Sequence, residues 1–399
     1  MKTKITNIGS IASRNNENQP LWDGEQVEIL IEDDIISEIG KKVSDADEEI
    51  NADGALITPG FVDSHTHPIF FGNRAKEFSM RAEGKSYSTI ARMGGGIVSS
   101  IQGIRNTSED ELFEECIERL DIFLMHGTTT IEAKSGYGLD VESELKSLRV
   151  IRRLQQESLL EIVPTFLGAH AFPQEFKNDK DGYVDLICNE MIPAVVEENL
   201  AVFCDVFCEK GYFTVKQSRK ILQTAKDHGL IPRLHADEFE DSGAANLAAE
   251  MGAISADHLM AASPKGLKAM GKSNVIATLL PGTTFFLKQK NYVDAKKFKK
   301  YGCELALATD FNPGSCTIQS MSLIITLAVL YCNMTVEEAL TAATYTGAKS
   351  LNLHKKVGQI KAGYQADLLF WEMDSIAELP YWIGSDRLLT VMKKGKLLD

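Results

Sequence analysis

Long apolar runs are missing from this sequence of 399 residues. The most apolar stretch, Leu323 to Tyr331, is far shorter than the ~20 residues that a membrane-spanning helix needs, and it is expected to form a core helix. The first residues, Met1 to Asn7, are mostly polar or charged and lack the apolar segment of a secretory signal. We therefore expect no membrane partner.

Paired cysteines and an excess of positive charge are also missing. The seven cysteines are an odd number, and their spacing matches neither a zinc ribbon nor a disulfide scaffold. This usage predicts a reducing, cytoplasmic location. The formal net charge of −14 argues against nucleic acid as a partner. A small anionic substrate is not excluded, because one arginine placed in a cleft can outweigh the overall field.

Both ends of the chain consist of short strand-like pieces, such as Val27 to Glu32 and Ala366 to Trp371. No long helical pattern interrupts them. Two β-rich ends around a different middle predict one small β-sandwich domain formed from both termini, residues 1–57 plus 357–399. The central domain would then span residues 58–356.

The central part alternates apolar strand candidates with amphipathic helices. Such strands are typical of a parallel sheet covered on both faces. Eight of them predict a (β/α)₈ TIM-type barrel, and an open doubly wound sheet is the alternative. The predicted helices include Glu111–Met125, Glu142–Gln156, Val215–His228 and Ile318–Cys332. The predicted strands are Ile57–Thr66, Thr128–Lys134, Ile162–Ala169, Val202–Glu209, Ile231–Ala236, Ala253–His258, Val275–Leu280 and Leu305–Asp310.

Polar side chains gather where these strands end, which is where a barrel carries its catalytic groups. Only His126, His228 and His354 lie elsewhere among the eight histidines. This placement favours the barrel over the open sheet. The residues at or just beyond strand ends are His65, His67, Lys134, Tyr137, His170, His235, Glu238, His258, Asp310 and Asn312.

His65 and His67 form a His-x-His pair at the end of the first predicted strand. Residues i and i+2 of a strand point to one face, roughly 6.5–7 Å apart at Cα. Two imidazoles can therefore converge on one cation. With His235 and Asp310 from other strand ends, they form a plausible site for zinc or another divalent ion that activates water.

The remaining polar residues suggest substrate chemistry. Glu238, three residues after His235, suits general acid/base work. His258 is a candidate proton shuttle or oxyanion donor. Arg74 could grip a substrate carboxylate with both edges of its guanidinium. Lys134 has three interpretations: it anchors an anionic substrate, it is carboxylated and bridges two metals, or it pairs with Glu132 or Asp140.

The glycines Gly94, Gly95 and Gly96 lack the spacing of a nucleotide fingerprint. A loop that closes over the site is the better interpretation.

The residues around the His-x-His pair resemble the amidohydrolase superfamily, beginning with the run Pro59 to His67. Within it the chain is similar to the branch that opens the imidazolone ring in histidine degradation. Matching segments span nearly the whole chain, and the most specific are Lys134-Ser-Gly-Tyr-Gly and Asp310-Phe-Asn-Pro-Gly-Ser.

The resemblance implies hydrolysis of the cyclic amide C–N bond of 4-imidazolone-5-propanoate, which yields N-formimino-L-glutamate. It implies one zinc or iron ion on His65, His67, His235 and Asp310. Proton transfer would fall to Glu238, His258 or Asp310. The substrate would be bound by Arg74, Tyr137, His170, Asn312, Gly314 and Ser315.

Two rival functions remain at this point. One is a deaminase or another cyclic-amidine hydrolase of the same superfamily, although a nucleobase would need no Arg74. The other is a non-catalytic barrel that serves as an interaction scaffold, although such proteins usually lack the metal ligands. A homodimer is expected, because barrels with an added sheet often pair.

Overall fold

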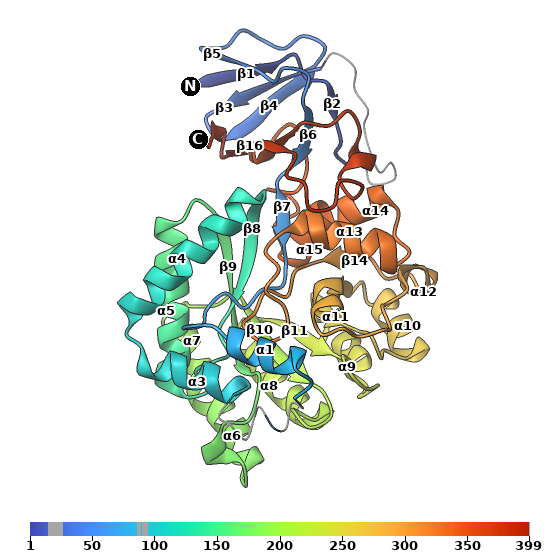
Figure 1. Cartoon of the computed structure of the whole chain (residues 1–399). Coiled ribbons are helices and arrows are strands. Elements are labelled where there is room, and N and C mark those ends of the chain that lie inside the picture. Colours follow the sequence, from blue (N-terminus) through green and yellow to red (C-terminus); the bar gives the residue numbers. More distant parts are fainter. Residues whose placement is uncertain (15–26, 86–88, 90–94, 399) are drawn as a thin grey trace.

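The computed structural model describes residues 1–14, 27–85, 89 and 95–398. Figure 1 shows a barrel with two small sheets stacked against one end of it, and both termini lie in those sheets. Within the described ranges, none of the helices is both long and apolar enough to cross a bilayer.

The central sheet has eight parallel strands that neighbour one another in chain order, from β7 to β14. Beyond the last strand, Thr66 and Phe311 form a parallel bridge, which brings the first and last strands together. This nearly closed barrel confirms the predicted fold and excludes the open sheet. The strands are β7 (Phe61–Asp63), β8 (Thr128–Lys134), β9 (Glu161–Ala169), β10 (Phe203–Cys208), β11 (Ile231–Ala236), β12 (Ser255–His258), β13 (Ile276–Leu279) and β14 (Leu305–Leu307).

Helices separate the barrel strands, and their ends carry the expected capping residues. Ser108 and Glu111 form a capping box at the start of α4, and Thr214 and Gln217 form one at α8. The four helices predicted from the sequence are present. The helices are α1 (Ala75–Ala82), α3 (Ile97–Asn106), α4 (Glu109–Met125), α5 (Val141–Glu157), α6 (Lys180–Leu186), α7 (Ile192–Glu197), α8 (Val215–Asp227), α9 (Ala244–Met251), α10 (Pro264–Lys272), α11 (Pro281–Phe286), α12 (Ala295–Lys300), α13 (Met321–Tyr331), α14 (Val336–Thr341) and α15 (Gly347–Ser350).

The terminal residues form two sheets, as expected for the ends of the chain. One has the order β4-β3-β1-β5 and the other β17-β16-β15-β6-β2. Their shared core includes Ile29, Ile57 and Phe370, which come from both ends of the chain. The exact domain division into 1–57 plus 357–399 and 58–356 stays a prediction. The strands are β1 (Lys2–Thr6), β2 (Ser10–Ile11), β3 (Glu28–Glu32), β4 (Ile35–Gly40), β5 (Glu48–Asn51), β6 (Leu56–Pro59), β15 (Leu368–Trp371), β16 (Leu388–Lys393) and β17 (Lys396–Leu397).

The first predicted strand, Ile57–Thr66, is two strands in two sheets. β6 pairs with β15 in a terminal sheet, whereas β7 pairs with β8 in the barrel. The break falls at Gly60, where a Cβ atom would lie 2.2 Å from the Thr129 hydroxyl. Only glycine permits this close approach, and the apolar run on both sides conceals the change of sheet.

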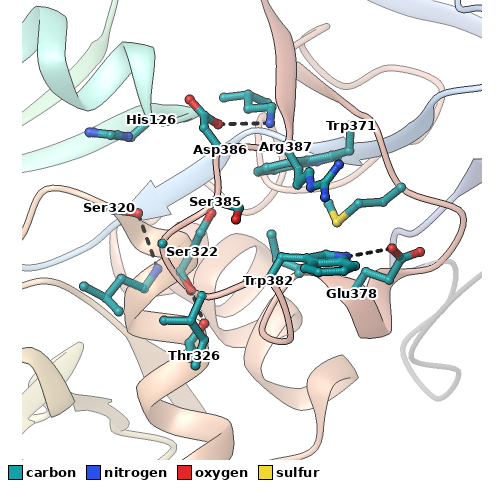
Figure 2. Close-up of a pocket in the computed structure, with 16 residues that line it drawn as sticks. His126, Ser320, Ser322, Thr326, Trp371, Glu378, Trp382, Ser385, Asp386 and Arg387 are labelled. Atoms are coloured by element: carbon teal, nitrogen blue, oxygen red, sulfur yellow. Dashed lines mark hydrogen bonds between the residues drawn. The ribbon is translucent and has the colours of Figure 1, made fainter.

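A cavity of about 410 Å³ lies at the junction between barrel and terminal sheets. In Figure 2, Trp371, Trp382 and Arg387 lie around it, and the Trp382 indole donates to Glu378 at 2.9 Å. Its lining is mostly apolar and includes none of the polar strand ends. The polar strand ends line a different cavity, which contains His67, His235 and Asp310.

Candidate metal centre and active site

The four predicted metal ligands converge at the bottom of a cavity, beside the bridge that joins the first and last barrel strands. The Asp310 amide donates to the His65 carbonyl at 3.0 Å. Two of the four predicted ligands thus belong to the backbone contact that closes the barrel. The Nε2 atom of His67 lies 3.3 Å from that of His65 and 3.3 Å from that of His235. The Oδ1 atom of Asp310 lies 3.4 Å from His67 Nε2 and 3.6 Å from His65 Nε2. All four side chains are buried.

Two carboxylates determine which ring nitrogens face the centre of this cluster. The Asp257 carboxylate lies 2.7 Å from His65 Nδ1, and Asp205 lies 3.1 Å from His235 Nδ1. Because an ionised carboxylate only accepts, each Nδ1 carries the proton and each Nε2 presents a lone pair.

These lone pairs fit a bound cation. The Nε2 atoms of His65 and His235 both face the Nε2 atom of His67 at 3.3 Å, and one N–H of His67 cannot satisfy both lone pairs fully. A tetrahedral ion with bonds of about 2.0–2.1 Å places its ligand atoms about 3.3 Å apart. Three imidazole nitrogens and one carboxylate oxygen are also a donor set that zinc and iron accept.

The backbone is strained at this cluster. Asp310 and His258 have φ values of +54° and +75°, in the left-handed region that residues other than glycine rarely adopt. Thr283 donates to the second Asp310 oxygen at 2.6 Å. Such strain persists only where the surroundings hold it, and it concentrates at functional sites.

Glu238 and His258 lie together above the ligand cluster. The Glu238 carboxylate is 3.8 Å from His258 Nδ1. Burial, and then the neighbouring Asp310 charge, raise the pKa of Glu238 to about 8. Burial also lowers the pKa of His258, which keeps its ring neutral. Neither ring nitrogen of His258 has a hydrogen-bond partner within the described structure, although the ring is buried. His258 is therefore not a satisfied core histidine.

Lys134 lies beneath the ligand cluster, not in the cavity above it. Its ammonium group bonds Glu132 and Asp205, both at 2.7 Å. Of the three interpretations, the structure supports ion pairing, with Glu132 but not with Asp140, which caps α5 instead. The lysine thus stabilises the same Asp205 that orients His235.

Asp205, Asp257 and Arg233 of this buried layer were missed in the sequence, whereas Glu132 was predicted only as a possible partner of Lys134. Arg233 lies 3.2 Å from Glu132 and 3.3 Å from Asp257, and all three side chains are fully buried. One available signal was a charged residue inside an otherwise apolar strand, as with Asp205 in the run Phe203 to Cys208. The pairing itself joins different strands and has no local signature.

A cavity of about 360 Å³ opens above the ligands. It has the size of a small-molecule site. The backbone of its far wall is tied by Asn312, whose Oδ1 accepts from the amides of Gly314 and Ser315 at 2.8 and 2.7 Å. All six residues predicted to bind substrate line the cavity: Arg74, Tyr137, His170, Asn312, Gly314 and Ser315.

Arg74 is held firmly at this wall. Its Nε and a terminal nitrogen donate to Glu77 at 3.0 and 2.8 Å. A Cβ atom on Gly314 would lie 2.3 Å from another Arg74 nitrogen, so the missing side chain makes room for the guanidinium. Of the glycine run, Gly94 lies outside the described residues, and the predicted closing loop stays a prediction.

The fold and the ligand cluster together define a metal-dependent hydrolase. The sequence matches the Amidohydrolase family over residues 56–398, and the chain belongs to that family. Curated relatives narrow the class to imidazolonepropionases. The imidazolonepropionase of Clostridium tetani is 47% identical, and the match covers 94% of this chain and 91% of the relative. The imidazolonepropionase of Geobacillus kaustophilus is 44% identical, and the match covers 100% of this chain and 93% of that relative.

Solved structures support the fold independently. A triazine hydrolase variant superposes with a TM-score of 0.77 at 16% identity and covers 100% of this chain and 94% of its own. The 5-methylcytosine deaminase of Klebsiella pneumoniae, with 5-fluorocytosine bound, superposes with a TM-score of 0.75 at 17% identity. The match covers 99% of this chain and 97% of the deaminase. At such identities the likeness shows the barrel with its terminal sheets and nothing of the substrate.

Proposed function

We propose that the chain hydrolyses 4-imidazolone-5-propanoate to N-formimino-L-glutamate in histidine degradation. The observation that carries the proposal is one cavity with a cluster of metal ligands at its floor and arginine at its wall. A ring carbonyl and a carboxylate at opposite ends of one small substrate match those two groups. The full-length likeness to imidazolonepropionases supports the same substrate.

We propose that His65, His67, His235 and Asp310 hold one divalent metal, zinc or iron. Such an ion, when bound, supplies a Lewis acid and lowers the pKa of water towards neutrality. The proposal of a single ion is supported by Lys134, whose ammonium already pairs with two carboxylates at 2.7 Å. A lysine in that position does not serve as a carboxylated bridge between two metals.

In the proposed reaction, water adds to the ring carbonyl carbon, the ring C–N bond breaks, and the departing nitrogen gains a proton. Glu238 suits both transfers, because a carboxyl group with a pKa near neutrality can take a proton and return it. Neutral His258 has ring nitrogens without partners among the described residues, and it would donate to the oxygen that becomes negative. Asp310 is the alternative base.

The other cavity residues orient the substrate. Arg74, fixed by Glu77, would bind the propionate carboxylate with its remaining N–H groups. The His170 Nδ1 atom lies 2.9 Å from the Gly136 carbonyl, which leaves its Nε2 as an acceptor for a ring N–H. Tyr137 lies beside His170, with ring centres 5.2 Å apart. The cavity wall that would contact the bound product consists of Asn312, Gly314 and Ser315.

The reaction is tested by following the ultraviolet absorbance of imidazolone propionate with and without a chelator. We expect turnover that the chelator abolishes and added zinc or iron restores. A parallel assay measures ammonia release from cytosine, adenine and guanine. Ammonia release without ring opening of the imidazolone would identify the rival deaminase, and a chain that never retains metal would identify the scaffold.

We also propose that two copies associate and that they work in a reducing compartment, the cytoplasm. The first proposal is supported by Tyr381, Trp382 and Ile383, which are 71%, 39% and 58% exposed beside the junction cavity of Figure 2. The second is supported by seven cysteines that are all buried and unpaired. Light scattering should give twice the mass of one chain. Trp382→Glu should reduce the measured mass to that of a single chain.

A further inference from the structure

Helix α1 carries two arginines on the side that faces the catalytic cavity. Arg74 is its N-cap residue, and Arg81 lies in its last turn. Seven residues are nearly two full turns of an α-helix, so the two side chains leave the helix in nearly the same direction. Both line the cavity that contains His67, His235 and Asp310.

The charge of the first arginine is already balanced. Glu77 accepts from two nitrogens of Arg74, and its second oxygen accepts from the Gly96 amide at 3.1 Å. Arg74 and Glu77 are only 14% and 13% exposed. This pair fixes the orientation of Arg74, but it presents little net charge to an approaching anion.

The second arginine has different surroundings. Among the residues that the structure describes, no carboxylate lies within ion-pairing distance of Arg81. Its guanidinium lies 5.9 Å from the ring centre of Phe78 and 5.5 Å from that of Phe286. Aromatic faces hold a guanidinium in place without occupying its N–H donors. Burial and then the charge of Arg74 lower the pKa of Arg81, and the more distant charge of Glu77 offsets this only in part.

We propose that Arg81 is a second carboxylate-recognition residue, which gives the mouth of the cavity its net positive charge. The inference rests on the proposed function, because it requires an anionic substrate. A chain with a net charge of −14 repels anions overall. An unbalanced arginine at the cavity supplies local attraction, which raises both the rate of encounter and the affinity.

The first test compares steady-state kinetics of Arg81→Gln, Arg81→Lys and the unchanged chain on imidazolone propionate at increasing salt. For Arg81→Gln we expect KM to rise about tenfold, kcat to stay within about twofold, and the fall of kcat/KM with salt to flatten. Arg81→Lys should keep most of the salt dependence. Lys41→Gln removes one positive charge from an exposed position after β4 and is the control. Its KM, kcat and salt dependence should equal those of the unchanged chain.

The second test measures binding of the stable analogue imidazole-4-propanoate and of its uncharged amide by calorimetry. The unchanged chain should prefer the acid, and Arg81→Gln should lose about tenfold of that preference. An unaltered KM, salt dependence and preference in Arg81→Gln would overturn the role of Arg81. If the unchanged chain itself fails to open the imidazolone ring, the proposed function fails instead.

Discussion

Glu238 differs from the other carboxylates around the ligand cluster. Asp205 pairs with Lys134 and Asp257 with Arg233, whereas no lysine or arginine of the described structure pairs with Glu238. Burial without a compensating cation, and then the nearby Asp310 charge, raise its pKa to about 8, above the usual acidic range. This difference supports the proposed proton-transfer role of Glu238, whereas Asp205 and Asp257 orient the histidines.

Glu238→Gln should therefore keep its metal and lose turnover. General acid/base groups contribute about 10²–10⁴-fold in rate, and we expect a fall in kcat of that size. Elemental analysis of the purified variant gives the metal content. Near-native turnover with full metal content would remove Glu238 from this role and leave Asp310 as the base.

Asp257→Asn should weaken metal binding and leave the fold intact. Asp257 fixes the tautomer of His65 through its bond to Nδ1, and loss of such an outer partner typically costs 10–100-fold in metal affinity. Competition with a coloured chelator measures the affinity. Asp45→Asn, at an exposed position before β5, is the matched control and should not change it.

Single residues were the easiest part to predict where chemistry lies next to a strand end. The ends of predicted strands carry all four of the cluster residues, and the structure brings them together: His65, His67, His235 and Asp310. Glu77 and Arg81 escaped notice because a charged residue on an amphipathic helix is ordinarily solvated. Only the position of α1 over the cavity distinguishes them.

At the scale of elements, Gly60 determines how the chain passes from a terminal sheet into the barrel. A methyl group there would lie within 2.2–2.8 Å of three side-chain atoms of Thr129, which is buried. Thr129 belongs to β8, so it has little freedom to move away.

Gly60→Ala should accordingly lower the free energy of unfolding by about 1–3 kcal/mol, the usual cost of overpacking. Urea denaturation with the metal removed measures it. In Gly40→Ala the nearest atom to the new methyl group would be 3.7 Å away, so this control should change stability by less than about 0.5 kcal/mol. Equal stabilities of the two variants would contradict the steric argument.

Two strands, β8 and β11, have the bounds that the sequence predicted. The prediction of a single strand over Ile57–Thr66 was wrong. An apolar pattern indicates that residues are buried, but it does not indicate which sheet buries them. Pairing partners decide that question, and β6 finds its partner β15 far away in the sequence.

For the whole molecule, the buried layer under the cavity has an excess of negative charge. In the described structure, Lys134 and Arg233 pair with three of its carboxylates, those of Glu132, Asp205 and Asp257. The fourth carboxylate, that of Asp310, contacts His65 and His67 and pairs with no lysine or arginine of the described residues. A bound divalent cation would offset that excess, so metal should stabilise the folded chain as well as activate it.

Removal of the metal should lower Tm, and zinc or iron should restore it. A ligand at 100 times its Kd contributes about 2.7 kcal/mol to the folded state. Scanning calorimetry of the chelated and reloaded chain measures the difference. An unchanged Tm, with metal content shown to differ, would mean that the cluster is stable without its cation.

The pairing of β6 with β15 also sets an order for biosynthesis. The first metal-ligand pair follows β6 by a few residues, yet the strand beside β6 leaves the ribosome about three hundred residues later. Long-range pairing of this kind closes slowly and leaves an edge exposed meanwhile. The terminal sheet therefore gains β15 beside β6 only after all eight barrel strands have been synthesised, so the strand that leads into the barrel is paired on that side last.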